Sequence, residues 1–331
     1  MKAGLINVSG DYVLEPRYKA IFNAMDAGPI CVRDLVEDHQ AVAGGGHVGG
    51  MWRFIDLDGN PAFDREFEPA TRFGDGLALV TASGRTEEYI DWSGVTRIKP
   101  QVDDAFPFRG GRAKAKVDGR FGIIDTLGEW IHPPTLDHLD DFSCGLAVAG
   151  MPGHGFLHGY LNIHGRWAIP PRFRFPGDFS EGLAFATNED FCGFIDIRGE
   201  PVIEFDEPCK SYRFSEGLAS VWSSLEDDPL AGYINTCGEM VIPPLFDYGS
   251  TFTEGYAAVQ VDGKWGFIDR AGRYTVPPVY EDALYGFSHG LAMVRENGVY
   301  RFVDPGGVPA FDRSFANATS FRNGLARVDV E

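Results

Sequence analysis

The hydrophobic and polar positions of this chain follow a short pattern that returns along its whole length. In runs such as 218–221 (LASV) and 266–269 (GFID), small or apolar residues alternate with residues of other types. Gly, Pro, Asp or Asn separates the runs. Alternation over about four to eight residues between turn residues is typical of β-strands, whereas an amphipathic helix repeats its apolar positions every 3.6 residues or so. We therefore expect a mainly β protein with almost no long helix.

An Asp or Asn follows each pair of apolar residues, and a Gly stands three positions later. This is type I turn chemistry, because the Asx side chain caps backbone N–H groups and Gly takes the left-handed conformation. The spacing inside the turn never varies, and most neighbouring copies are about 35 residues apart, as expected of tandem repeats. The pattern predicts nine repeats, which turn at Asn7, Asp56, Asp91, Asp125, Asn162, Asp196, Asn235, Asp269 and Asp304.

A second block, F-x-x-G-L-A-x-V in its clearest form, also recurs. Its copies span residues 73–80, 108–115, 142–149, 179–186, 214–221, 252–259, 287–294 and 321–328. Three repeats continue with a dipeptide that strongly favours a tight hairpin, namely Asp118 with Gly119, Asp262 with Gly263, and Asn297 with Gly298. A proline segment such as 241–244 (VIPP) closes the repeat, and proline cannot donate a ladder hydrogen bond. Each repeat is thus predicted to be a β-hairpin followed by an extended connector.

Apolar residues occur on both faces of the predicted strands, so one repeat cannot bury them alone. Neighbouring repeats that stack on each other bury these apolar faces. We expect Gly266 to permit close packing between repeats. A propeller blade takes about 40 to 45 residues, more than this repeat has. The favoured fold is an all-β open solenoid or superhelix of stacked hairpins over residues 1–331. A closed propeller-like ring is the alternative, because half repeats at 4–10 and 321–328 begin and end the chain.

Residues 264–269 (KWGFID), with 252–259 before them and 276–278 (VPP) after them, resemble the WG, or KWG, repeat family of bacteria. The similarity covers nearly the whole chain. Only this repeat keeps the Trp–Gly pair in full, and the first repeat has no recognisable GLA block between Phe22 and Asp34. Membership in this family would imply a repeat scaffold and would transfer no catalytic residues.

The chain is strongly acidic, with 48 Asp and Glu against 29 Lys and Arg and a formal charge of −19. Such a charge repels nucleic acid and anionic membranes, so we expect a basic or neutral protein partner instead. The five cysteines form no C-x-x-C pair and are predicted to be reduced thiols. No apolar stretch has the length of a signal peptide or a membrane span, which favours a cytoplasmic monomer.

Three patterns could be taken as chemical sites, and each has a simpler explanation. Residues 44–49 (GGGHVG) match a dinucleotide fingerprint, but a predicted strand at 52–56 follows where a helix is required. His154, His158 and His164 crowd one segment and could hold a metal, yet they fall in a loop insertion and a turn. The nine Asx residues are too far apart for stacked calcium sites. We predict no cofactor, no metal and no catalytic residue.

Acidic residues gather at the predicted hairpin tips. If these tips lie along one edge of the array, they form a negative strip that would steer a basic partner. Solvated loops are the alternative explanation, and residues 109–120 are instead basic. The residues predicted to contact the partner are Trp222, Glu226, Asp227, Asp228, Glu189, Asp190, Glu87, Glu88, His154 and His158.

The pattern favours a non-catalytic protein–protein interaction scaffold, because loops vary at one end of a constant hairpin. One specific version is a bacterial immunity or inhibitor protein that covers the active site of a basic toxin. A carbohydrate or cell-envelope binder is the second hypothesis, since residues 265–267 (WGF) are similar to choline-binding repeats. An enzyme with an unrecognised site is the third, although H-E-x-x-H, G-x-S-x-G and P-loop motifs are absent from the sequence.

Overall fold

A computed structural model describes residues 1–22, 28–34, 51–68, 70–82, 86–206, 211, 213–222, 229–283 and 285–331. These residues form strands and turns, and no helix occurs among them, so none could cross a membrane as a helix. The predicted all-β class is confirmed. The chain forms two compact units. Residues 1–117, 124–130 and 311–331 make the first, and residues 118–123 and 131–310 make the second.

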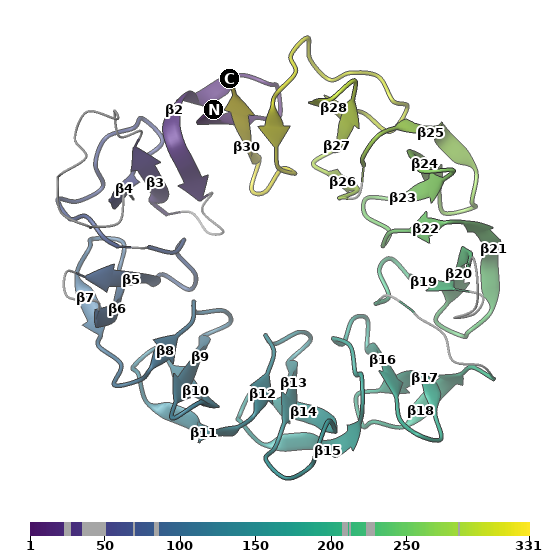
Figure 1. The fold of residues 1–331 in the computed structure, drawn as a ribbon, viewed down its shortest axis with the longest axis horizontal. Coiled ribbons are helices and arrows are strands. Elements are labelled where there is room, and N and C mark those ends of the chain that lie inside the picture. The colour runs from purple at the N-terminus through teal and green to yellow at the C-terminus, as the bar shows by residue number, and fades with distance from the viewer. Residues whose placement is uncertain are drawn as a thin grey trace, which may run out of the picture. The chain divides into compact units, whose positions relative to one another are not determined.

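The largest sheet of the first unit contains both ends of the chain (Figure 1). Its antiparallel strands run in the order β29 (Asn317–Ala318), β30 (Leu325–Val330), β1 (Lys2–Asn7), β2 (Tyr12–Phe22), β3 (Ile30–Asp34) and β4 (Trp52–Ile55). β1 pairs with β30 from Lys2 opposite Val330 to Asn7 opposite Leu325. The half repeat at the start of the chain therefore completes the half repeat at its end.

Smaller sheets make up the rest of the first unit. One contains β5 (Ala78–Ala82), β6 (Thr86–Ile90) and β7 (Thr96–Ile98). In the next, β8 (Asp104–Ala105) pairs with β9 (Arg112–Val117). The chain then passes through β10 (Arg120–Asp125) and β11 (Trp130–Leu136) into the second unit.

The second unit contains five further antiparallel sheets, each with its strands paired in chain order. The first holds β12 (His138–Leu139), β13 (Leu146–Gly150), β14 (His158–Asn162) and β15 (Trp167–Phe173). The second and third hold β16 (Leu183–Thr187), β17 (Cys192–Asp196) and β18 (Pro201–Glu204), then β19 (Leu218–Trp222), β20 (Ala231–Asn235) and β21 (Met240–Phe246). The last two hold β22 (Tyr248–Gly249), β23 (Tyr256–Val261), β24 (Lys264–Asp269) and β25 (Tyr274–Tyr280), then β26 (Phe287–Ser288), β27 (Leu291–Glu296) and β28 (Val299–Val303).

The segment predicted to be an extended connector is a strand, so the prediction of a two-stranded hairpin repeat was wrong. β21 pairs with β20, and β25 pairs with β24, so a repeat contributes a sheet of three or four strands. These proline-containing strands lie at the ends of their sheets. An edge strand tolerates proline because the missing N–H has no ladder partner to bond.

Gly266 lies at an irregularity between β24 and β25. Trp265 pairs with Tyr280 while Phe267 pairs with Val276, so the register between the two strands shifts at the glycine. A Cβ on Gly266 would stand 2.5 Å from the carbonyl oxygen of Val276. The close approach is therefore inside the repeat, and the expectation that it lies between repeats was wrong.

The predicted turns are confirmed. All nine glycines of the Asx turns have positive φ, from 68° at Gly165 to 86° at Gly128. The F-x-x-G block contains a second tight turn that the sequence pattern did not indicate. Glu216 and Gly217, for example, both have positive φ and join Ser215 to Leu218. Two successive positive φ values indicate a type I′ hairpin turn.

The core explains why the two sequence blocks recur together. In six of the eight F-x-x-G blocks, the Phe packs against the aromatic residue of the second strand in the preceding repeat, with ring centroids 4.7 to 5.0 Å apart. These pairs are Phe54 with Phe73, Tyr89 with Phe108, Tyr160 with Phe179, Phe194 with Phe214, Tyr233 with Phe252, and Phe267 with Phe287. Ring contacts of this kind add to the free energy gained by burial, so each repeat depends on its neighbour.

Candidate partner-binding cavity

A cavity of about 720 Å³ opens in the second unit between the fifth and sixth repeats, which turn at Asn162 and Asp196. Three segments line it: residues 156–157 of the β13–β14 loop, residues 172–175 at the end of β15, and residues 188–190 of the β16–β17 turn. The volume is in the range of small-molecule and peptide side-chain pockets, roughly 300 to 1,000 Å³. The predicted partner residues Glu189 and Asp190 belong to this lining.

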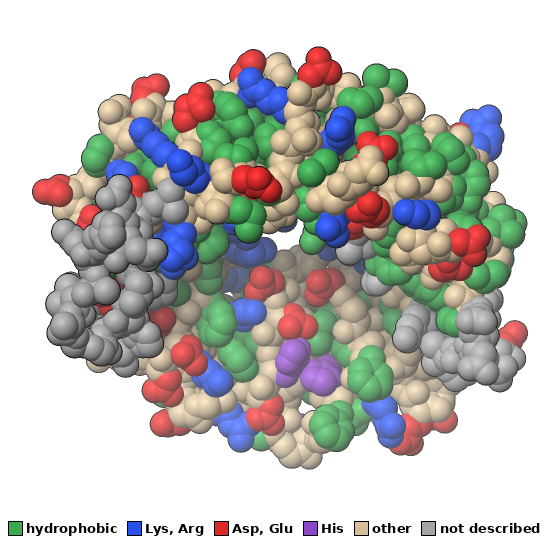
Figure 2. Space-filling view, turned by 45° about the horizontal axis from the view of Figure 1, so that its top comes forward, with side chains coloured by type: hydrophobic (Ala, Val, Ile, Leu, Met, Phe, Trp, Pro, Cys, Tyr) green, Lys and Arg blue, Asp and Glu red, His purple; other side chains and the backbone are tan. Residues whose placement is uncertain are grey.

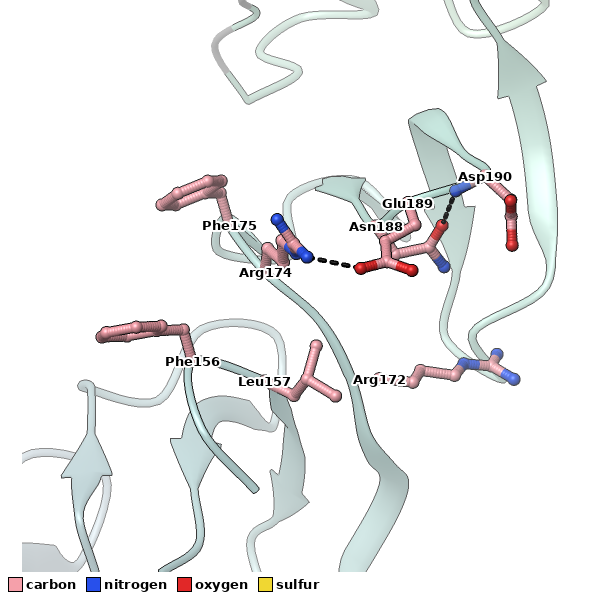
Figure 3. A pocket seen from close by; sticks show the side chains of 8 residues that line it. All are labelled: Phe156, Leu157, Arg172, Arg174, Phe175, Asn188, Glu189 and Asp190. Carbon is pink, nitrogen blue, oxygen red and sulfur yellow. Dashed lines mark hydrogen bonds and ion pairs between the residues drawn. The ribbon is translucent and has the colours of Figure 1, made fainter. Parts of the chain in front are cut away.

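Two phenylalanine rings stand at the mouth of the cavity with little cover. Phe156 is 85% exposed and Phe175 is 74% exposed. Both side chains point to the same side, away from Arg172 (Figure 3). Single exposed apolar side chains are common on protein surfaces, but two of them beside one cavity offer an apolar contact surface to a ligand.

Charged groups form the opposite wall. The Nη2 of Arg174 donates to Oε1 of Glu189 at 2.5 Å (Figure 3). Arg172 donates to the carbonyl oxygen of Gly199, and its guanidinium lies 5.2 Å from the ring centroid of Phe173. Two cations and two carboxylates therefore line the cavity, so its charge is balanced although the protein is acidic.

Local turn chemistry holds the acidic tip in place. The backbone N–H of Asp190 donates to Oδ1 of Asn188 at 2.9 Å, and the N–H of Asn188 donates to the carbonyl of Phe191 at 2.9 Å. The N–H of Arg174 donates to the carbonyl of Thr187 at 2.7 Å, which ties the end of β15 to the next hairpin. The cavity is thus built by backbone contacts between successive repeats.

The three histidines that the sequence places in one segment lie in different surroundings in the structure. His154 is exposed in the loop and His164 is exposed in the Asn162 turn. His158 instead packs against His138 of β12, with ring centroids 4.9 Å apart, and Nε2 of His138 lies 3.1 Å from Oδ2 of Asp140. Among the described residues, no three His, Cys, Asp or Glu side chains are placed to hold a metal ion.

The His158 side chain has a perturbed pKa. Burial lowers the pKa of this imidazole below its usual value, and the nearby His138 charge lowers it further. The carbonyls of Arg174 and Phe156 and the carboxylate of Asp140 act in the opposite direction. Burial and the neighbouring imidazole thus disfavour the charged form of His158.

Two of the predicted acidic tip residues lie in strand β6 instead. Glu88 is only 3% exposed and pairs with Arg65, while Lys99 lies 3.8 Å from it. Glu87 accepts a hydrogen bond from the N–H of Ala105 at 2.7 Å, and burial raises its pKa. The assignment of Glu88 to a surface strip was wrong, because a buried, paired carboxylate cannot contact a partner.

The remaining predicted residues are in other surroundings. Trp222 ends β19, is partly buried, and has its ring centroid 5.9 Å from that of Tyr248. Glu226, Asp227 and Asp228 lie outside the described residues, as does the 44–50 loop. On the face drawn in Figure 2, acidic and basic side chains are interspersed among apolar ones and do not form one negative strip.

The two exposed phenylalanines were not among the residues predicted from the sequence. Phe156 stands in the Gly-rich segment 152–159 (PGHGFLHG), and Phe175 follows the edge strand β15. Phe156 lies outside any alternating pattern of a buried strand, and this was the available signal, whereas Phe175 continues the alternation of residues 172–175 (RFRF) and carried no such signal. Large apolar residues in segments rich in turn residues deserve consideration as contact residues.

The sequence matches the family described as "WG containing repeat" at residues 52–84, 89–121, 121–150, 159–190, 232–265 and 265–300. No curated protein matches the chain significantly. A solved eukaryotic initiation factor has a TM-score of 0.62 and 9% identity, covering 95% of this chain and 94% of its own. BamB from Moraxella catarrhalis gives 0.46 and 12%, covering 99% and 96%, and Kluyveromyces lactis Hsv2 gives 0.38 and 12%, covering 71% and 89%. At such identities the likeness to the initiation factor concerns the fold alone.

Proposed function

Because the chain belongs to the family of WG-containing repeat proteins, we propose that it is a non-catalytic scaffold whose cavity between the fifth and sixth repeats binds a protein partner. The observation that carries the proposal is the pair of exposed rings, Phe156 and Phe175, beside a cavity with fixed charges. Interfaces are enriched in aromatic residues and arginine, and binding energy concentrates in a few such side chains.

The partner segment that fits this cavity has an apolar side chain flanked by polar or charged groups. The apolar group would cover Phe156 and Phe175, while Glu189, Asp190 and the arginines would orient its neighbours. Pairs that already exist, such as Arg174 with Glu189, limit the entropy lost on binding because they hold the wall in place. The charge of −19 favours a partner that is basic overall, through faster association. An immunity or inhibitor protein acting on a basic toxin is one version of this proposal.

A carbohydrate ligand is the second candidate. The cavity offers aromatic faces beside Asn188, Asp190 and two arginines, all of which can bond hydroxyl groups. A phenylalanine ring has no polar tip, unlike Tyr or Trp. The rings at the mouth therefore favour an apolar side chain over a sugar.

We also propose that the repeat array is closed. Pairing of β1 with β30 supports this, since it unites the two half repeats in one sheet and leaves neither of these strands as an edge. An exposed edge strand invites aggregation, and closure removes it. The open solenoid is then the less favoured form.

Affinity capture from the source cell tests the function. The double variant Phe156→Ser, Phe175→Ser should lose about tenfold or more of the captured partner, because truncating interface anchors costs upwards of about 1 to 2 kcal/mol each. Leu245→Ser is the matched control, since Leu245 is 60% exposed on β21 of the same unit. Capture of a glycan in place of a protein would support the second candidate. Equal capture by all three forms would contradict the cavity assignment.

A further inference from the structure

The charged side chains of the cavity between the fifth and sixth repeats differ in whether the protein itself already engages them. Arg174 donates to Glu189, and Arg172 donates to the carbonyl oxygen of Gly199. The guanidinium of Arg172 also lies 3.9 Å from Oε1 of Glu200, a carboxylate outside the lining. Both cations of the lining are therefore occupied by groups of the same chain.

Asp190 is the exception among these charges. It is exposed in the β16–β17 turn, where its backbone N–H donates to Oδ1 of Asn188. Among the residues that the structure describes, none hydrogen-bonds to its carboxylate or forms an ion pair with it. An incoming cation can pair with Asp190 without displacing a group of the protein, whereas an incoming anion meets two arginines that are already engaged. The lining therefore favours a cation over an anion.

The position of Asp190 relative to the two exposed rings indicates how a partner segment would lie. Figure 3 shows Phe156 and Phe175 on one side of the lining and Asp190 on the other, with Leu157 between them. Lysine and arginine bury an apolar stem along apolar surface while the charged end stays in polar surroundings. A basic side chain can thus place its stem over Leu157 and its cation at Asp190, next to an apolar side chain that covers the rings.

We propose that the cavity recognises an apolar residue with a lysine or arginine beside it, in an exposed segment of the partner protein. The apolar side chain contacts Phe156 and Phe175, and the cation of its neighbour pairs with Asp190. This inference rests on the proposed function, because it specifies the partner of the same cavity. The net charge of −19 acts in the same direction, since it attracts basic partners over a longer range.

Selection of peptides from a random library displayed on phage tests the charge of the recognised neighbour. The natural chain should enrich peptides that carry Lys or Arg beside an aromatic or aliphatic residue. Asp190→Lys should instead enrich peptides with Asp or Glu at that place, because like charges repel the basic residue. Selection of the same basic peptides by both forms, or of no peptide by the natural chain, would overturn the inference.

The double variant Phe156→Ser, Phe175→Ser separates this inference from the proposed function. If the double variant loses the peptides that the natural chain selects while Asp190→Lys keeps them, the cavity binds a partner and only the basic neighbour is refuted. If the double variant keeps the same peptides, the proposed function fails together with the inference.

Calorimetric titration of the full chain with one selected peptide measures the size of the effect. Asp190→Asn should weaken binding by about three- to tenfold, the range between an exposed ion pair and a charge-assisted hydrogen bond. Glu204→Gln is the matched control, because Glu204 is exposed on β18 outside the lining, and it should bind as the natural chain does. An equal loss in both variants, or no loss in Asp190→Asn, would overturn the contact with Asp190.

Discussion

The Glu216 carboxylate accepts a hydrogen bond from the backbone N–H of Gly255, one repeat further along the chain, at 2.9 Å. Both residues lie in F-x-x-G turns, Glu216 at the first and Gly255 at the second positive-φ position. The same contact recurs elsewhere, between Asp75 and Gly111, Glu181 and Gly217, and Glu254 and Gly290. An acidic side chain in one turn thus accepts a hydrogen bond from the backbone of the next turn, which adds a polar contact to the ring contacts between repeats.

Replacing Glu216 by Ala should remove this link and lower the free energy of unfolding by about 1 kcal/mol, the usual net value of one hydrogen bond. Glu216→Gln should cost less, because its amide oxygen can still accept from Gly255. Both variants place a non-Gly residue at the same positive φ, so backbone strain cancels in the comparison. Denaturant unfolding monitored by circular dichroism measures the free energy of unfolding of each variant. Equal values for Glu216→Ala and Glu216→Gln would show that this hydrogen bond adds no stability.

Gly266→Val should destabilise the protein by about 3 kcal/mol or more, in the class of severe steric changes. The reason is the 2.5 Å separation between a Cβ at this position and the carbonyl of Val276, which is backbone and cannot rotate away. Lys264→Ala is the control, since Lys264 is exposed at the start of β24. Melting temperatures compare the two variants, and a similar loss in both would refute the steric account.

His158 should make the protein less stable as the pH falls below about 6.5, the ordinary pKa of histidine. Burial, followed by the charge of His138, lowers the pKa of His158 in the folded state. The unfolded chain therefore takes up its proton first, and the stability present above this pH is lost progressively toward the folded pKa. His158→Gln should flatten the change in melting temperature between pH 7.5 and 5.5.

His164→Gln is the control for that series, because His164 is exposed in a turn. It should leave the pH dependence as in the natural chain. If His158→Gln and the natural chain lose stability in parallel, the pH dependence arises from other groups.

Pairing of β1 with β30 predicts that removing residues 325–331 lowers the melting temperature strongly, because β1 then loses its partner on one side. For the full chain, the closed form predicts a radius of gyration of about 20 Å, the value of a compact protein of this length. Small-angle X-ray scattering measures it. A markedly larger radius would favour the open superhelix.

The features that the sequence predicts correctly are those with a local physical cause. Asn7 with Gly10 and Asp269 with Gly272 form their turns through contacts within four residues, so the residue types alone indicate them. The same is true of the paired glycine tips, such as Asp262 with Gly263. The family followed from the repetition of these local signals.

The features that the sequence does not predict are those that depend on residues distant along the chain. The connector at residues 240–246 is a strand because β20 offers it a free edge, which no local pattern reports. Glu88 looked like a tip residue, yet Arg65 comes from another segment to pair with it. Its acidic neighbours in the sequence gave no sign of burial.

The candidate cavity was half predictable from the sequence. Glu189 and Asp190 were selected as part of an acidic tip, and they line it. Phe156 and Phe175 were not selected, because their position beside one cavity depends on how the fifth and sixth repeats pack. The sequence by itself determined the all-β class and the Asx turns, since these rest on backbone preferences of a few residues. Only the tertiary structure decided which side chains are buried, which meet across repeats, and that the first strand pairs with the last, because those choices depend on contacts between residues far apart in the chain.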